Sequence, residues 1–242
     1  MSSEWTLLAL TAASVGLIHT LIGPDHYVPF IVMARARSWS LVRTLGITLA
    51  CGVGHVLGSI VLGAVGVALG WSLGGLDWLE GIRGEVAAWL LLGFGLAYTI
   101  WGIRRAIRSR PHSHLHDHAD GTVHEHRHTH QAEHVHVHES AAARQPTPRV
   151  GLTPWVLFVI FLFGPCEALI PVLMYPAAAG QWWTIALVAT VFALCTIVTM
   201  LAVVALGYFG LSRLAFGGLE RYSHALAGLT LVACGLAIQF GL

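Results

Sequence analysis

Lysine is absent from this 242-residue sequence, and charged residues of any kind are scarce. All 13 positive charges are arginines, and charged residues make up 10% of the chain, whereas a soluble domain carries about 25%. So small a charged fraction cannot cover a globule with polar surface, which excludes an ordinary water-soluble fold. The formal net charge of +1 provides no basic surface, so we expect no nucleic-acid partner.

Cysteine is also scarce, and its placement excludes a disulfide scaffold. The four cysteines, Cys51, Cys166, Cys195 and Cys234, all lie inside apolar runs, unlike the cysteines of a secreted disulfide framework. Each is therefore expected to be a small buried hydrophobe. The N-terminus lacks the basic region and the cleavage site of a signal peptide, so its apolar run is expected to stay as a membrane span.

Long apolar runs are what the sequence has in place of charge. A bilayer core is crossed by about 20 helical residues, and six stretches qualify: 5–22, 44–69, 86–103, 152–179, 184–211 and 222–242. Gly164-Pro165 and Pro171 interrupt the fourth stretch, which predicts a broken helix. Because the runs are continuous and do not alternate, the sequence predicts an all-α membrane protein and not a barrel.

The positions of the arginines predict how the chain is oriented. All but one fall between spans one and two, three and four, or five and six, and only Arg83 falls on the opposite side. Under the positive-inside rule, both termini face outward and the central loop is cytoplasmic. We therefore expect a multi-pass protein of the cell (inner) membrane, with no arginine in the core of a span.

The chain divides into two similar halves, residues 1–108 and 151–242, joined by residues 109–150. Each half holds three predicted spans and one Gly-Pro break, GPDH at 23–26 and GPCE at 164–167. An odd number of spans gives the halves opposite orientations, so we expect a 3+3 inverted repeat. Transporters recurrently have this architecture, with sites where broken helices meet near the midplane. The predicted function is transport, not enzymatic catalysis.

Polar residues at the two breaks and in the second span are candidate ligands for a transported ion. They are His19, Asp25, His26, His55, Cys166 and Glu167. Ionisable groups at membrane depth are costly and by default mark a pathway or a site. Imidazole with carboxylate is a ligand set for transition metals, whereas Mg²⁺ favours oxygen ligands alone. Taken singly, His19 or His55 is explained as well by a hydrogen bond to a neighbouring helix.

The joining segment 109–150 carries 11 of the chain's 15 histidines. It has almost no large apolar residues, so we expect a disordered cytoplasmic loop. Histidine at every second position suits labile binding of Zn²⁺, Ni²⁺, Co²⁺ or Cu²⁺. A pH sensor is the alternative, because imidazoles titrate at about pH 6.5. The candidate loop ligands are His112, His114, His116, His118, His124, His126, His128, His130, His134, His136 and His138.

The stretch HTLIGPDH at 19–26 resembles a known signature. Its H-x5-D-H pattern is that of the hydrogenase and urease accessory permeases, one residue longer than the H-x4-D-H signature of nickel/cobalt transporters. The Gly54-His55 pair, the histidine-rich loop and GPCEALIP resemble nickel/cobalt efflux permeases, and all these groups belong to the LysE-type superfamily. The resemblance implies a six-span nickel or cobalt transporter with His19, Asp25 and His26 in its metal site and, by a weaker match, His55.

Two other branches of this superfamily leave alternative functions open. Thiol-disulfide electron carriers also place Pro-Cys at a broken helix, as at Pro165-Cys166, and Cys51 or Cys195 is then the candidate partner thiol. Sulfite and organic-anion exporters share the layout, but an anion pathway should present arginines or helix N-termini.

For a metal transporter, a cytoplasmic loop that gathers metal favours export slightly over import. The expected partners are the lipid bilayer and the transported metal ion. No permanent cofactor is expected, and self-association into a homo-oligomer stays open.

Overall fold

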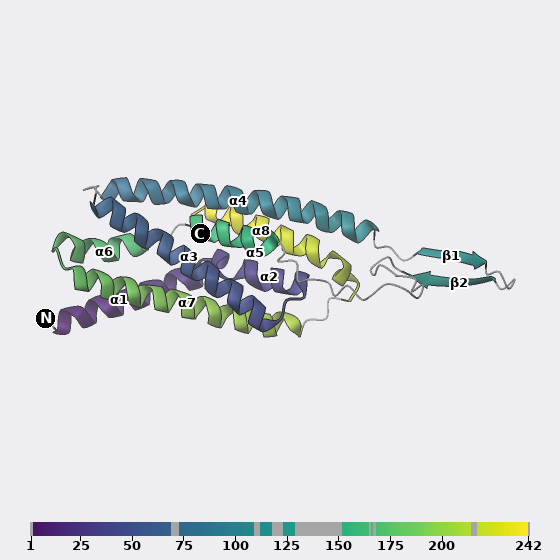
Figure 1. Cartoon of the computed structure of the whole chain (residues 1–242), viewed down its shortest axis with the longest axis horizontal. Helices are drawn as coiled ribbons and strands as arrows, with labels where there is room; N and C mark the ends of the chain where they lie inside the picture. The colour runs from purple at the N-terminus through teal and green to yellow at the C-terminus, as the bar shows by residue number, and fades with distance from the viewer. Residues whose placement is uncertain are drawn as a thin grey trace, which may run out of the picture.

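The computed structural model describes residues 2–68, 73–108, 112–117, 123–128, 152–164, 166, 168–213 and 217–241, which form a helical bundle with a two-stranded ribbon at one end (Figure 1). Five helices are long and apolar enough to cross a membrane. They are α1 (Ser2–Ile22), α3 (Leu41–Ala68), α4 (Leu73–Arg108), α7 (Trp182–Ser212) and α8 (Ser223–Gln239). The predicted helical membrane class agrees with this architecture, while the count of six spans stays a prediction.

Shorter elements lie between the long helices, and the two Gly-Pro motifs interrupt helices as predicted. They are η1 (Pro24–His26), α2 (Val28–Arg37), α5 (Leu152–Phe163), α6 (Leu169–Ala178) and η2 (Gly217–Tyr222). α1 ends at Ile22 because Gly23 is extended (φ −81°, ψ 97°) and Pro24 has no amide hydrogen to continue the helix. The fourth predicted span is two short helices, α5 and α6, separated at Gly164.

The two halves of the chain are interlocked. α1 packs against α7, α3 against α5 and α7, and α4 along α8, as Figure 1 shows for the last pair. Glycine allows α4 and α8 to approach closely, because a Cβ at Gly228 would collide with Thr99 and the Gly95 carbonyl. Helices in lipid gain little from hydrophobic burial against one another, so close backbone packing of this kind holds them together.

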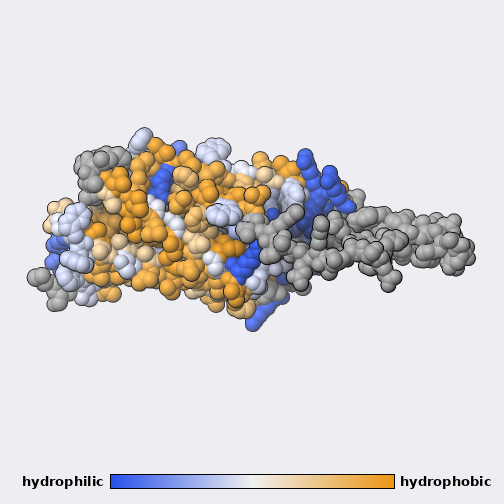
Figure 2. Space-filling view, in the orientation of Figure 1, coloured by the Kyte–Doolittle hydropathy of each residue, from blue (hydrophilic) through white to orange (hydrophobic). Residues whose placement is uncertain are grey.

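The face of the bundle that Figure 2 shows is predominantly apolar. Large hydrophobic side chains such as Leu7, Trp89, Trp183, Val198 and Leu206 are more than half exposed. A soluble monomer rarely exposes contiguous apolar patches beyond a few hundred Å², so this surface is consistent with a lipid environment. The orientation and the identity of the membrane remain predictions.

The third apolar helix starts earlier in the chain than the predicted span, and it includes Arg83. The helix begins at Leu73 and its membrane-compatible stretch at Trp78, not at residue 86. Arg83 lies near one end of this candidate span, which also includes Arg104, Arg105 and Arg108 near its other end, so the expectation about span cores stays a prediction. Arg83 forms an i,i+3 ion pair with Glu80, which lets both charges occupy an otherwise apolar helix.

Part of the histidine-rich segment is paired, whereas the sequence predicted disorder throughout it. β1 (His112–Asp117) and β2 (Val123–His128) are antiparallel. The register places three histidine pairs opposite each other: His112 and His128, His114 and His126, His116 and His124. Histidine at every second position has the two-residue period of a strand, which accounts for the difference. The other predicted loop ligands, His118, His130, His134, His136 and His138, lie outside the described residues.

Candidate metal centre

Three histidines from three different elements converge inside the bundle. His19 lies near the end of α1, His26 in η1 and His55 within α3, and their ligand nitrogens all lie within 4.8 Å of one another. The ring centroids of His19 and His26 are 4.7 Å apart, and those of His26 and His55 are 5.2 Å apart. The break after α1 produces this convergence, because η1 turns His26 back beside His19 and against α3.

In two of these rings, Nδ1 forms the hydrogen bonds and Nε2 is left without a partner among the described residues. His26 Nδ1 lies 3.1 Å from the Gly23 carbonyl oxygen and 3.2 Å from Asp25 Oδ1, and His55 Nδ1 lies 3.4 Å from the Phe161 carbonyl oxygen. A carbonyl and an ionised carboxylate can only accept, so we assign the proton to Nδ1 in both rings. In a neutral ring of this tautomer, Nε2 carries the lone pair.

The Nε2 atoms of His19, His26 and His55 are buried and have no hydrogen-bond partner in the described part of the chain. An unsatisfied buried polar group costs about 1–3 kcal/mol, so three in one place make the cluster a candidate ligand site. Three neutral imidazoles fit a first-row divalent ion, including Zn²⁺, Ni²⁺, Co²⁺ and Cu²⁺. A carboxylate behind a ligating histidine, as Asp25 stands behind His26, fixes the ring and raises its basicity.

Asp25 lies beside the histidine cluster and also faces a cavity. Its side chain is 20% exposed, against 3% for His26. Together with His19, His26 and Glu85 it lines a cavity of about 610 Å³, bounded by the N-terminal half of α4 and the C-terminal end of α8. The charged residues lining this cavity are carboxylates and not arginines, so its field favours cations.

Cys166 is not a member of the histidine cluster. Its side chain packs in an apolar cluster with Ala12, Leu169 and Phe192. Glu167, predicted beside it as a ligand, lies outside the described residues. The second break therefore contributes no described ligand to the centre.

The thiol positions also bear on a redox function. All four cysteines are free, and Cys51 belongs to a different buried cluster from Cys166. Cys195 Sγ donates to the Ala13 carbonyl oxygen on α1 at 3.1 Å. The structure thus brings neither candidate partner thiol into a bond with Cys166.

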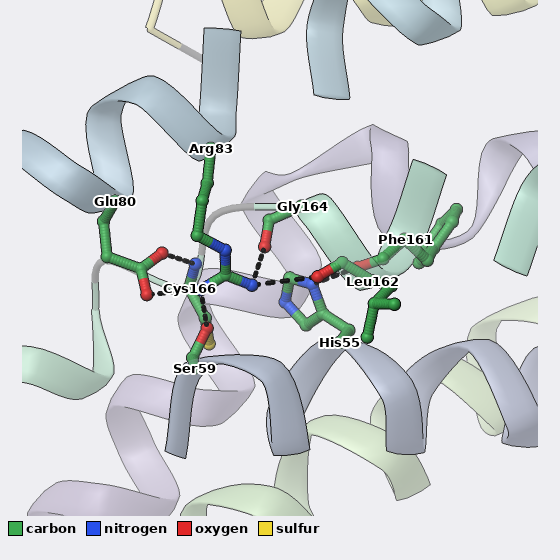
Figure 3. Close-up of polar contacts among 8 residues, drawn as sticks. All are labelled: His55, Ser59, Glu80, Arg83, Phe161, Leu162, Gly164 and Cys166. Atoms are coloured by element: carbon green, nitrogen blue, oxygen red, sulfur yellow. Dashed lines mark hydrogen bonds and ion pairs between the residues drawn. The ribbon is translucent and has the colours of Figure 1, made fainter. Parts of the chain in front are cut away.

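Besides Glu85, two further polar residues of α4 were not predicted from the sequence, Glu80 and Arg83 (Figure 3). Glu80 is 1% exposed and pairs with Arg83 at 2.5 Å. The guanidinium is thereby compensated, so it offers no unpaired positive charge to an anion. The available signal was the i,i+3 spacing of opposite charges next to an apolar run, which is typical of a continuing helix.

No family model, curated protein or solved structure matches this chain. What the centre can do therefore follows from its donors and surroundings. Three imidazoles, one of them hydrogen-bonded to a carboxylate, lie close together beside a cavity lined by carboxylates. Such an arrangement can take up a divalent transition-metal ion and exchange it through the cavity.

Proposed function

We propose that this protein transports a divalent transition-metal ion, nickel or cobalt, across a membrane in the direction of export. One observation carries the proposal: three histidines whose ligand nitrogens lie within 4.8 Å of one another each have a buried Nε2 that lacks a hydrogen-bond partner among the described residues. They belong to helices long and apolar enough to cross a bilayer or to the break between such elements. A ligand set at that position suits an ion in passage.

The order of elements in the two halves supports a transport cycle. Each half runs from a helix through a Gly-Pro break to a short helix and then two long helices. If the α5–α6 pair counts as one crossing, this order matches a 3+3 inverted repeat with six spans. Rocking of one half against the other would then expose the histidine cluster to each side in turn.

The choice of metal and direction has separate support. The resemblance of HTLIGPDH to signatures of nickel/cobalt transporters favours nickel or cobalt within the group that imidazole accepts. Export is favoured because the histidine-rich segment, on the arginine-rich side, would gather cytoplasmic metal. The acidic cavity lies toward the end of α4 remote from the ribbon (Figure 1), which suits release on the other side.

Metal flux into proteoliposomes tests the proposal. We expect the protein to carry Ni²⁺ or Co²⁺. His26→Ala should reduce this flux about 10- to 100-fold, the effect typical of disturbing a metal site. His224→Ala is the matched control, because His224 lies outside the cluster and bonds to Tyr98. Cells that produce the protein should contain less of the transported metal than cells without it.

Two results would count against this function. Equal flux through the protein and the His26→Ala variant would remove the histidine cluster from the pathway. Sulfite flux that is indifferent to added metal and to deletion of residues 112–138 would favour an anion exporter instead.

A further inference from the structure

The break between α5 and α6 leaves backbone groups without helical partners, and one ion pair of α4 binds groups on both sides of it (Figure 3). Arg83 Nη2 donates to the carbonyl oxygens of Leu162 at 3.0 Å and Gly164 at 3.3 Å. Glu80 Oε2 accepts the amide of Cys166 at 3.2 Å. The cation thus lies at the C-terminal end of α5 and the anion before the N-terminal end of α6, as the helix dipoles favour.

Arg83 also connects this break to α3. Its Nη1 donates to Ser59 Oγ at 3.0 Å, one helical turn beyond His55. The guanidinium therefore ties together three elements: α4, on which it lies, α3 through Ser59, and the end of α5. Because these bonds fork from one planar group, the position of the α5 terminus is fixed in direction as well as in distance.

The metal-facing ring of His55 depends on the same stretch of backbone. His55 Nδ1 lies 3.4 Å from the Phe161 carbonyl oxygen, which precedes the carbonyls that Arg83 holds. Gly164 borders the ring too, because a Cβ there would lie 3.0 Å from His55 Nδ1. The orientation of the imidazole is thus set by residues 161–164, and the position of residues 161–164 by Arg83.

We infer that Glu80 and Arg83 are positioning residues for the metal ligand His55, holding the end of α5 so that His55 Nε2 faces His19 and His26. The inference rests on the proposed metal function. It names a charged pair on α4 that touches no ligand nitrogen but determines how the third ligand is presented. Removing a group that orients a metal-bound histidine typically weakens metal affinity about 10- to 100-fold.

A purely stabilising role is a poor explanation for this pair. Removing two charges from water is costly, and apolar residues of similar size usually stabilise a buried position as well or better. The bonds to Leu162, Gly164 and Cys166 are directional and converge on the break. A positioning role uses that directionality, whereas apolar packing would not supply it.

Binding of Co²⁺ alone to the full-length protein in lipid nanodiscs tests the inference. The difference between the Co²⁺ absorption spectra of the protein and its His26→Ala variant isolates the buried centre from the histidine-rich segment. We expect Arg83→Gln to weaken the Co²⁺ affinity measured from this difference signal about 10- to 100-fold and to shift the ligand-field bands of the bound Co²⁺. Arg83→Lys, which keeps the charge but not the fork, should recover part of the affinity.

Arg105→Gln is the matched control, because Arg105 lies on the same helix and its guanidinium stacks over Trp101 far from the break. If Arg83→Gln does not fold, Glu80→Gln/Arg83→Gln removes both charges and leaves no lone buried ion. Unchanged Co²⁺ affinity and bands in the Arg83 or the double variant, even with a lower melting temperature, would overturn the inference. If the Co²⁺ spectra of the unsubstituted protein and of His26→Ala do not differ, the proposed metal function is overturned instead.

Discussion

At the scale of single residues, His26 is the centre of the candidate site. Its ring is adjacent to both other imidazoles, and its Nδ1 contacts Gly23 and Asp25. These contacts fix the tautomer that leaves Nε2 as a donor of electrons to metal. In the proposed metal site, Asp25 would act through His26, so the two residues of the Asp-His pair would have different roles.

Asp25→Asn tests the task assigned to the carboxylate. The amide oxygen can still accept from His26 Nδ1, but the negative charge that raises imidazole basicity is gone. We expect affinity for Co²⁺ to fall about tenfold, the lower end of the range for such partners, measured by titration in nanodiscs. Glu85→Gln is the control, since Glu85 lines the same cavity, whereas the described hydrogen bonds of His26 go to Gly23 and Asp25. A larger loss of Co²⁺ affinity in Glu85→Gln than in Asp25→Asn would show that the carboxylate role belongs to Glu85 and not to Asp25.

At the scale of the structural element, the break between α1 and α2 builds the site. The Gly23 amide donates to the His19 carbonyl at 3.0 Å, the His26 amide to Gly23 at 3.1 Å and the Tyr27 amide to Pro24 at 3.3 Å. These bonds satisfy amides inside the bundle, where lipid offers no partner. The turn is therefore compact, and it returns His26 to the side of His19.

Gly23→Ala tests how closely this turn must fit. The backbone at Gly23 is allowed for alanine, but its Cβ would lie 2.5 Å from His26 Nδ1 and 2.8 Å from Asp25 Oδ1. We expect the imidazole to be displaced and Co²⁺ binding to weaken by about tenfold or more.

The matched control for the turn is Gly46→Ala, because a Cβ at Gly46 meets nothing within 4 Å. Alanine is the better helix former by about 1 kcal/mol, so this variant should melt no lower than the parent and bind Co²⁺ equally well. Equal binding by Gly23→Ala would mean that the turn tolerates a shifted ring.

At the scale of the whole molecule, two interlocked halves enclose the centre within an apolar exterior. Elements of the first half supply all three histidines, while the second half supplies the Phe161 carbonyl that orients one of them. Movement of one half against the other would therefore alter the ligand set directly. Whether the halves are inverted depends on whether α5 and α6 together cross the membrane.

Reporter fusions test that crossing. We expect a fluorescent protein fused after residue 120 to fluoresce in the cytoplasm, and alkaline phosphatase fused after residue 242 to be active outside the cell. This follows from the arginine-rich loops and from three crossings after the histidine-rich segment. A C-terminus on the same side as residue 120 would mean two crossings, α7 and α8, and would contradict the inverted repeat.

The sequence alone determined the helical membrane class, the two breaks and the three histidines of the cluster. Hydropathy and Gly-Pro are local properties of a chain, so they indicate where helices form and stop without knowledge of the fold. The two-residue period of the histidines is also visible in the sequence, and part of that segment forms paired strands where disorder was predicted.

Only the tertiary structure decided which candidates meet. His19, His26 and His55 converge, whereas Cys166 packs elsewhere, because contact depends on how helices distant in sequence pack together. Glu80 and Arg83 were missed for the same reason. Their charges shortened the predicted span, and only the fold reveals that they cancel each other and bind both sides of the second break.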